Sequence, residues 1–392
     1  MDIRSVLTIT FLGHLLNHSL TLIYPVVMIQ LAGLYPQTSL TTLGLLGTVH
    51  YLLYGLGGFP AGWLADRLGA RNILLIYFMG SAAAVIYLVL APGLINLAVG
   101  LALLGLFCAL YHPAGLTLIS HTSQRISRHL GIHGIAGSLG LTLGPLLGGA
   151  VAAWFGWRAP FVLFGFLSAA AGVYVWLTSA NSEVRWSPSH HQARRPTLIR
   201  PLIYCYLIGI FMGLAHRGTL NFLPLHFSQV FESAGWRMAP VMVGGFLTAL
   251  VLACGILGQT LGGLWGDHSP RHRIMVIVVA LNIPFLILMT VTRGYVLVLT
   301  AVFWGVVNFA YQPIANALVS DFSNPRQRGT LFGILHGLTF GVGALAATLA
   351  GAIGDRWGTV AIFAVMGILL LPAVAAGLLL RRESTVVSID SG

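Results

Sequence analysis

The chain carries very little charge for its length. Only 7% of its 392 residues are charged, whereas 57% are hydrophobic. A soluble domain has about 25% charged residues, so this composition excludes an ordinary soluble protein. Lysine is absent, since all 20 basic residues are arginines. The sequence therefore predicts an all-α membrane protein that crosses the lipid bilayer many times.

Several common functional motifs are also missing. The three cysteines (Cys108, Cys205 and Cys254) stand singly in apolar runs, which excludes a CxxC pair and a disulfide framework. No GxxxxGK[ST] sequence occurs, which argues against pumping driven by ATP bound to this chain. The residues form no catalytic constellation. We expect neither an enzyme nor a bound cofactor, and no resident metal.

Acidic residues are scarce, and their positions are informative. All nine fall in expected loops, termini or helix ends: Asp2, Asp66, Glu183, Glu232, Asp267, Asp321, Asp355, Glu383 and Asp390. A buried carboxylate that carries protons is therefore excluded. Ionisable groups within a membrane are costly and usually functional. The groups of this kind that remain in mid-span are Arg217 and several histidines.

The net charge of +11 does not indicate a nucleic-acid partner, because the arginines lie mostly between apolar runs. Fifteen fall on one side of the expected spans and four on the other. By the positive-inside rule, both termini and the central linker should be cytoplasmic, in a bacterial-type inner (plasma) membrane. We expect a monomer.

The sequence repeats itself after about 200 residues. Tyr111, Pro113 and Gly137 match Tyr311, Pro313 and Gly337, and a second segment around Asp66 recurs around Asp267. Two halves should therefore share one fold and enclose a substrate path. This predicts a transporter of a small molecule by alternating access. Twelve apolar runs are long enough to span a bilayer: 5–33, 40–65, 72–93, 95–120, 129–154, 158–179, 201–230, 238–266, 273–292, 295–320, 329–354 and 358–380.

These runs define the expected organisation. Residues 1–179 should form one six-helix bundle and residues 201–381 a second, pseudo-symmetric one. The polar stretch 180–200 reads as a cytoplasmic linker, and residues 382–392 as a cytoplasmic tail.

The loop after the second run carries a recognisable motif, Gly62-Trp63-Leu64-Ala65-Asp66-Arg67-Leu68-Gly69-Ala70-Arg71. It resembles the signature loop of the major facilitator superfamily, and a weaker echo runs from Gly263 to Arg273. The resemblance implies the major facilitator fold and a breakable latch between the halves. The gating residues we expect in these two loops are Asp66, Arg67, Arg71 and Asp267, and Arg328 is a further one later in the chain.

The fifth run contains a glycine-proline pattern made by Gly131, Gly140, Gly144, Pro145, Gly148 and Gly149. It is similar to a pattern associated with exporters of the antiporter branch of the superfamily. Glycines flatten one helix face, and Pro145 removes a backbone donor and bends the helix. We expect a bending element at the interface of the halves, and the resemblance favours efflux.

Three short strings narrow the resemblance. His14-Leu15-Leu16-Asn17-His18 with Tyr24-Pro25, then Tyr111-His112-Pro113-Ala114, and then Arg217 with Phe222-Leu223-Pro224-Leu225 resemble the fosmidomycin-resistance exporter family. The chain departs from that family at His18, where an acidic residue is usual. The resemblance implies a drug–proton antiporter.

Arg217 is the strongest candidate for binding the substrate. It lies about 16 residues into the seventh run, near the middle of the membrane. Its guanidinium stays charged and offers a planar fork of donors for carboxylate or phosphonate. We therefore expect an anionic or amphipathic substrate, for instance a drug, a metabolite or a metal chelator. Pairing with protein groups is the structural alternative.

The remaining candidates surround this position. His14 and His18 share one face of the first run, and by the repeat offset His18 aligns with Arg217 and Asn17 with His216. Because histidine titrates near neutral pH, His18 is the expected proton carrier, with His14 or His112 in support. The full set of expected substrate-binding residues is Arg217, His18, His14, Asn17, Tyr24, His112, His216 and Asn221.

Other functions stay open. The sequence does not give the direction of transport, so an importer or uniporter of a small organic anion is the first alternative. The histidines suggest a transition-metal carrier as the second, although Arg217 should repel a bare cation. A receptor or scaffold would leave the glycine-proline span and the latch without a purpose.

Overall fold

The structure is a computed structural model. It describes the backbone of residues 3–122, 126–178, 197–324 and 327–390. Side chains are described for all of these except residues 66, 120, 121, 126–128, 328, 329 and 384–390. No strand occurs in the described ranges, which are helical nearly throughout, as the composition predicts.

The first half of the chain forms seven helices within the described ranges. They are α1 (Ile3–Leu34), α2 (Leu40–Leu68), α3 (Ala70–Val89), α4 (Leu94–Ala109), α5 (Tyr111–Thr122), α6 (Ile126–Phe155) and α7 (Ala159–Thr178).

The second half begins with a long helix and repeats the pattern. Its elements are α8 (Ile199–Ser233), α9 (Pro240–His268), α10 (Arg271–Val291), α11 (Gly294–Asp321), α12 (Arg328–His336), the π-helix η1 (Gly337–Val342), α13 (Leu345–Trp357), α14 (Thr359–Ile368) and α15 (Leu371–Asp390).

Eleven helical stretches of the described residues are long and apolar enough to cross a membrane. In this count, α4 and α5 form one stretch, α12 to α13 form another, and α14 and α15 form a third. Helix α2 is not among them, although its 29 residues exceed the length that a span needs. Its glycines, tyrosines and His50 make it less apolar than the others. With α2, the helices correspond to the twelve predicted runs.

Three predicted runs are interrupted. Helix α4 ends at Ala109 and α5 starts at Tyr111, because Pro113 has no N–H to donate to the carbonyl of Ala109. The eleventh run widens into η1 between α12 and α13, a form that often marks functional sites. The twelfth breaks before Leu371, next to Pro372.

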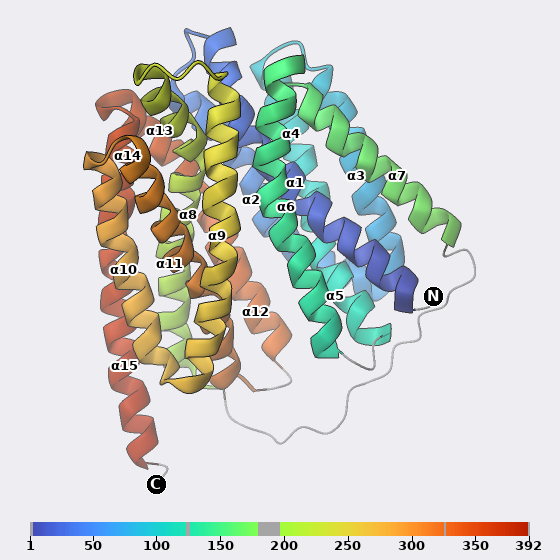
Figure 1. The fold of residues 1–392 in the computed structure, drawn as a ribbon. Coiled ribbons are helices and arrows are strands. Elements are labelled where there is room, and N and C mark those ends of the chain that lie inside the picture. The colour runs from blue at the N-terminus through green and yellow to red at the C-terminus, as the bar shows by residue number, and fades with distance from the viewer. Residues whose placement is uncertain (1–2, 123–125, 179–196, 325–326, 391–392) are drawn as a thin grey trace.

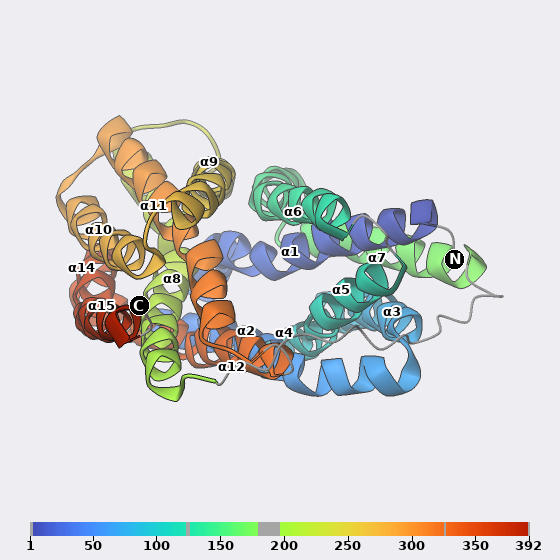
Figure 2. The ribbon, with the colours of Figure 1, turned by 90° about the horizontal axis from the view of Figure 1, so that it is seen from below.

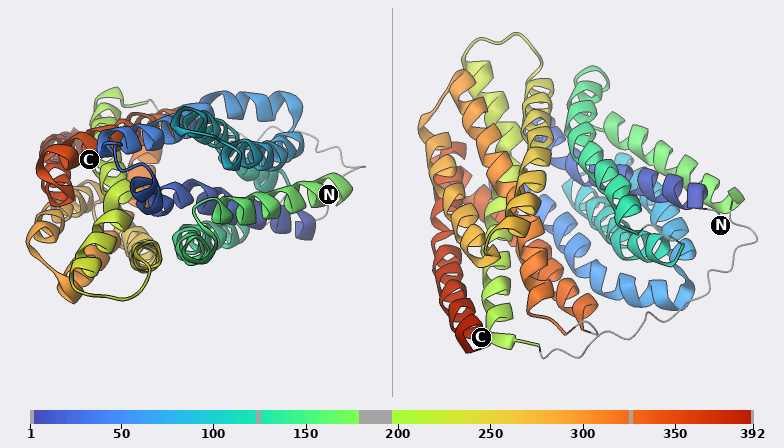
Figure 3. Two further views of the ribbon diagram at one scale, coloured as in Figure 1. Left: turned by 90° about the horizontal axis from the view of Figure 1, so that it is seen from above. Right: turned by 60° about the horizontal axis from the view of Figure 1, so that its bottom comes forward.

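The helices form two groups, one from each half of the chain, as Figures 1 and 2 show. At the end of the molecule away from both termini, α6 packs against α9, and α2 packs against α13. Toward the end that carries the termini, the two groups diverge (Figures 1 and 3). We call the first end the closed end and the second the open end.

Glycines allow the close contact at the closed end. A side chain at Gly149 of α6 would strike the carbonyl of Val241 at 2.7 Å and the Cα of Gly245 at 3.1 Å, both on α9. Likewise, a side chain at Gly44 of α2 would strike the backbone of Ala347 on α13. Bare backbone faces therefore let the two halves meet.

Polar contacts also join the halves there. The carboxylate of Asp355 on α13 accepts hydrogen bonds from the backbone N–H of Leu40 (2.7 Å) and of Thr41 (2.8 Å), at the start of α2. The hydroxyls of Thr48 and Thr348 lie 2.7 Å apart. Asp355 thus caps a helix of the opposite half, whose first N–H groups have no partners within the helix.

Two predicted boundaries differ from the structure. Helix α8 starts at Ile199, two residues inside the expected linker, most of which lies outside the described residues. Helix α15 continues to Asp390, through the expected tail, because neither glycine nor proline follows Gly377 before the end of the helix.

Candidate functional site

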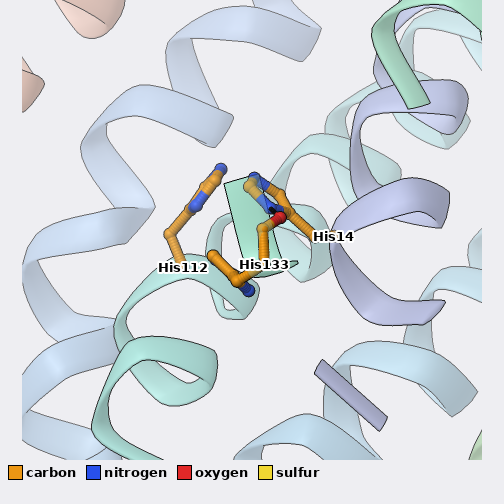
Figure 4. A group of neighbouring side chains, drawn as sticks. All are labelled: His14, His112 and His133. Carbon is orange, nitrogen blue, oxygen red and sulfur yellow. Dashed lines mark hydrogen bonds between the residues drawn. The ribbon is translucent and has the colours of Figure 1, made fainter. Parts of the chain in front are cut away.

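Five histidines meet between the two groups of helices. His14 and His18 lie on α1, His112 on α5, His133 on α6 and His336 at the end of α12. The His14 ring centroid lies 4.0 Å from that of His133, 4.8 Å from that of His18 and 5.1 Å from that of His112. The His336 ring reaches His112 from the second half, at 6.0 Å. We call these residues the histidine cluster; Figure 4 shows three of them.

Hydrogen bonds orient the rings. Nδ1 of His14 lies 2.6 Å from the carbonyl oxygen of His133. A carbonyl only accepts, so Nδ1 carries the proton, and Nε2 of a neutral His14 has a free lone pair. Nε2 of His18 lies 3.1 Å from that atom and donates to it. Gly137 leaves room for the His14 ring, which a side chain there would strike.

Tyr111 contacts the cluster and orients His133. The Tyr111 hydroxyl donates to the carbonyl of Thr10 at 2.5 Å and lies 3.3 Å from Nδ1 of His133. Because the hydroxyl proton goes to Thr10, Nδ1 of His133 is the donor to Tyr111, and its second nitrogen is free. The half-buried rings of His18, His112 and His336 complete a polar region in an otherwise apolar interior.

Arg217 lies beside the cluster, in the middle of α8. Its side chain is buried, and the guanidinium carbon lies 3.8 Å from the ring centroid of Tyr51 on α2. The Tyr51 hydroxyl donates to the carbonyl of Thr21, and the Thr21 hydroxyl donates to the carbonyl of His18. These contacts connect Arg217, through Tyr51 and Thr21, to the backbone of His18.

The charge of Arg217 has no acidic partner within the protein as described. Every ion pair between described side chains lies elsewhere, at Arg200 or Arg271. The Tyr51 ring face attracts the cation but leaves the N–H fork unneutralised. A buried charge is costly unless it is paired. The site can therefore accept an anion.

Other expected binding residues have structural hydrogen bonds. Asn17 donates to the carbonyl of Cys108 at 2.7 Å and accepts from Tyr54 at 3.2 Å, so it ties α1 to its neighbours. The Tyr24 hydroxyl donates to the carbonyl of Leu43. Both side chains are fully buried in these contacts, and their role in binding the substrate stays a prediction.

His216 and Asn221 flank Arg217 without joining the cluster. Nδ1 of His216 lies 2.8 Å from Oδ1 of Asn308, whose amide in turn donates to Asn282. Oδ1 of Asn221 is buried without a hydrogen-bond partner among the described atoms. Asn221 therefore keeps an acceptor available beside Arg217, whereas His216 belongs to a network within the second half.

The expected latch is described only in part. The side chains of Asp66 and Arg328 lie outside the described residues. Arg67 is exposed and stacks on Trp63, with its guanidinium carbon 4.1 Å from the ring centroid. At the open end of the second half, Arg271 donates to both oxygens of Asp321 (2.7 and 2.8 Å) and to Asp267 at 3.4 Å.

The glycines of α6 serve different contacts. Gly140 and Gly144 let α6 approach Leu15 and Ser19 of α1, in the same half. Gly149 meets α9 of the other half, and the carbonyl of Pro145 contacts Gly245. Gly131 and Gly148 face no atom within 4 Å. At the interface itself the important glycine is therefore Gly149, one residue after Gly148.

Four residues that matter in the structure were not among the expected site residues: His133, His336 and Tyr51 at the site, and Asp355 at the closed end. His133 lies among the glycines of α6, and no periodicity connects it with His14. Tyr51 and Asp355 act through contacts made more than 100 residues away along the chain. A polar residue within a glycine-rich membrane helix is the one local signal for His133.

The Major Facilitator Superfamily family model matches residues 6–253 and 239–391. The chain belongs to the Major Facilitator Superfamily. It is therefore an integral membrane transporter of small molecules and not an enzyme.

Relatives and solved structures agree with this membership. The chain is 24% identical to the multidrug resistance protein MdtG of Salmonella typhi, over 97% of this chain and 96% of that protein. It is 29% identical to the methylenomycin A resistance protein of Bacillus subtilis (strain 168), over 64% of this chain, and it spans only 49% of that relative.

Two solved structures share the fold. A bacterial homolog of the human lysosomal transporter Spinster, inward-facing and occupied, has a TM-score of 0.84 at 18% identity, with 96% of each chain covered. A D-xylose–proton symporter has a TM-score of 0.76 at 16% identity, with 97% of each chain covered. At these identities the likeness concerns the fold alone. The narrower resemblance to the fosmidomycin-resistance exporters stays a prediction.

Proposed function

We propose that this transporter exports a small anionic or amphipathic compound and that Arg217 binds its negative group. The observation that carries the proposal is the buried, unpaired guanidinium between the two halves. Its donor fork matches a carboxylate or a phosphonate, and an anion there would neutralise an otherwise uncompensated charge. The partly exposed rings around it would contact the rest of the compound.

Alternating access provides the mechanism. In the conformation seen here the halves meet at the closed end and diverge at the open end, which we assign to the cytoplasm from the arginine bias. A substrate anion would enter from the cytoplasm, bind Arg217 and favour separation of the closed end. Gly149 and Asp355 hold the contacts that must break.

We further propose that proton exchange drives export. The sequence has no nucleotide-binding motif, so an ion gradient must supply the energy. Sodium would need a cage of oxygen ligands, yet the sequence has no acid in the middle of an expected span. The direction rests on the glycine-proline span and on relatives named as resistance proteins. Which side chain carries the proton stays a prediction from the sequence.

The test is transport in proteoliposomes with an imposed pH gradient, using a panel of carboxylates, phosphonates and their neutral amides or esters. We expect the anionic compounds to be taken up against their concentration gradient when the vesicle lumen corresponds to the outside of the cell. The neutral compounds should not be taken up. Uptake only in the opposite orientation would assign the protein as an importer. Transport that ignores the charge of the compound would remove Arg217 as the anion site.

A further inference from the structure

The histidine cluster has a composition that anion binding alone does not explain. His14, His112 and His133 come from three different helices, and each offers a ring nitrogen within 4.8 Å of the others. Neutral imidazole is a favoured ligand of zinc, copper, nickel and cobalt. Three such groups converge here beside Arg217.

The rings are held as metal ligands usually are. A histidine that binds a metal through one nitrogen commonly donates the other N–H to a backbone carbonyl or a similar acceptor. Nδ1 of His14 donates to the carbonyl of His133, and Nδ1 of His133 donates to the Tyr111 hydroxyl. The second nitrogen of His133 is thus free to bind a metal, whereas Nε2 of His14 must first lose the hydrogen bond that it accepts from His18. The hydrogen bonds limit the rotation of both rings.

The spacing corresponds to an open site. Metal–nitrogen bonds of about 2.0–2.1 Å place tetrahedral nitrogen ligands about 3.3 Å apart, so the distances between the three nitrogens must shorten by about 1.5 Å at most. Three protein ligands leave a fourth position for another molecule. His18, whose Nε2 donates to Nε2 of His14 at 3.1 Å, would have to turn away when a metal binds that nitrogen.

The charges nearby decide the form of the cargo. Arg217 lies nearby, and no described acid pairs with it, so its charge should make a bare divalent cation bind less tightly than an anionic complex. An anionic chelator that carries the metal would satisfy both features. Its donor atom would complete the metal coordination, and its free negative group would reach Arg217.

We propose that the histidine cluster binds a divalent transition-metal ion through His14, His112 and His133, and that the cargo is an anionic complex of such an ion. The second part rests on the proposed function, because it assigns the negative group of the complex to Arg217. The first part concerns the cluster alone.

Cobalt binding to the purified transporter tests the cluster. The protein has 14 histidines, so it should be purified with an affinity tag that contains none. Titration with Co²⁺ alone should produce the absorption bands of a tetrahedral nitrogen site. We expect His112→Gln to weaken binding at least tenfold and to reduce these bands. The ring of His112 is half-buried, and the described residues give it ring contacts only, so this variant should fold.

His226→Gln is the matched control. This histidine is buried in α8, with Nδ1 3.3 Å from Thr359, outside the cluster. Its variant should bind Co²⁺ like the wild type. Absence of Co²⁺ binding in the wild type, or equal loss in both variants, would overturn the proposal. His14→Ala with a preserved melting temperature provides a second variant.

The complex is tested by adding citrate to Co²⁺. If the cargo is the complex, equimolar citrate should strengthen apparent binding at least tenfold, and Arg217→Lys should abolish that gain. If only the bare ion binds, citrate competes and weakens binding, which contradicts the cargo assignment. Arg217-dependent transport of metal-free anions without Co²⁺ binding would overturn this inference but leave the proposed function intact. Co²⁺ binding without transport of any anion would contradict the proposed function and the cargo assignment with it.

Discussion

The middle of the first helix in each half has the same place in the fold but different chemistry. By the repeat offset, His18 of α1 corresponds to Arg217 of α8. The first half contributes four of the five clustered histidines, whereas the second contributes His336 and the arginine. The two halves thus share a nearly symmetric scaffold but differ at its centre. The first half supplies mainly histidines, which can be neutral, whereas the second supplies the permanent positive charge of Arg217.

The glycines show the same divergence. Gly137 leaves space for the His14 ring, within one half, whereas its counterpart Gly337 leaves space for Phe59 of the other half. One position therefore shapes the cluster, and its repeat partner shapes the contact between the halves. A repeated backbone tolerates such differences because helix packing depends on small residues at fixed places, not on the polar groups beside them.

The largest effect on transport is expected from substitutions of Arg217, in the second half. Arg217→Ala should reduce transport about 100-fold or more, and Arg217→Lys about tenfold, because an ammonium lacks the bidentate fork. Initial rates in proteoliposomes measure both. Arg293→Lys is the matched control, since the hydrogen bonds of Arg293 to described residues go to the carbonyls of Thr290 and Thr292 beside it. Equal transport rates in Arg217→Ala, Arg217→Lys and Arg293→Lys would contradict a special role for Arg217.

The closed end offers a sharper pair of variants. Gly149→Leu should force α6 from α9, whereas Gly148→Leu points into open space. Overpacking costs about 1–3 kcal/mol, which corresponds to about 5–150-fold in a conformational equilibrium. Spin-label distances across the closed end should lengthen in Gly149→Leu alone. A normal distance and a normal transport rate in that variant would show that the halves do not meet there.

Asp355 should have a smaller effect. A helix cap contributes about 0.5–2 kcal/mol, so Asp355→Ala should favour opening of the closed end by a few-fold to about 30-fold. The readout is disulfide formation between Thr48→Cys and Thr348→Cys, whose native hydroxyls lie 2.7 Å apart. Cross-linking should slow in Asp355→Ala and less so in Asp355→Asn, which keeps one acceptor oxygen. An unchanged rate in both would mean that the cap does not hold the halves together.

The smallest effect is expected at the open end, where Arg271 pairs with Asp321 and Asp267 within one half. The acidic partners are largely exposed, so the pairs contribute about 1 kcal/mol or less. Arg271→Gln should change the transport rate less than about fivefold, and high salt should diminish the difference. A complete loss of transport, with normal expression, would show that this group contacts more than its own half.

The fold could be predicted from the sequence to a large extent. Hydropathy and the 200-residue repeat identified the helices, because the bilayer requires long apolar segments with satisfied backbones. The breaks near Pro113 and in η1 were missed, since they depend on local backbone geometry. Arg217, His14, His18 and His112 were identified because ionisable groups in membrane spans are rare.

The partners of those residues could not be predicted. His133 meets His14 only because α1 and α6 cross where Gly137 leaves room. Asp355 looked like an ordinary helix-end acid, yet it caps a helix 315 residues away in the chain. The sequence shows which ionisable residues lie in each helix, but their contacts with distant helices depend on how the helices pack.

The most direct test of the account is paired transport of a charged compound and its neutral isostere by wild-type protein and Arg217→Lys. A carboxylate from the panel that the wild type transports should be compared with its amide, in the same proteoliposomes. The account predicts fast transport of the carboxylate by the wild type, about tenfold slower transport by Arg217→Lys, and little transport of the amide by either. Equal transport of carboxylate and amide, unchanged in Arg217→Lys, would contradict it.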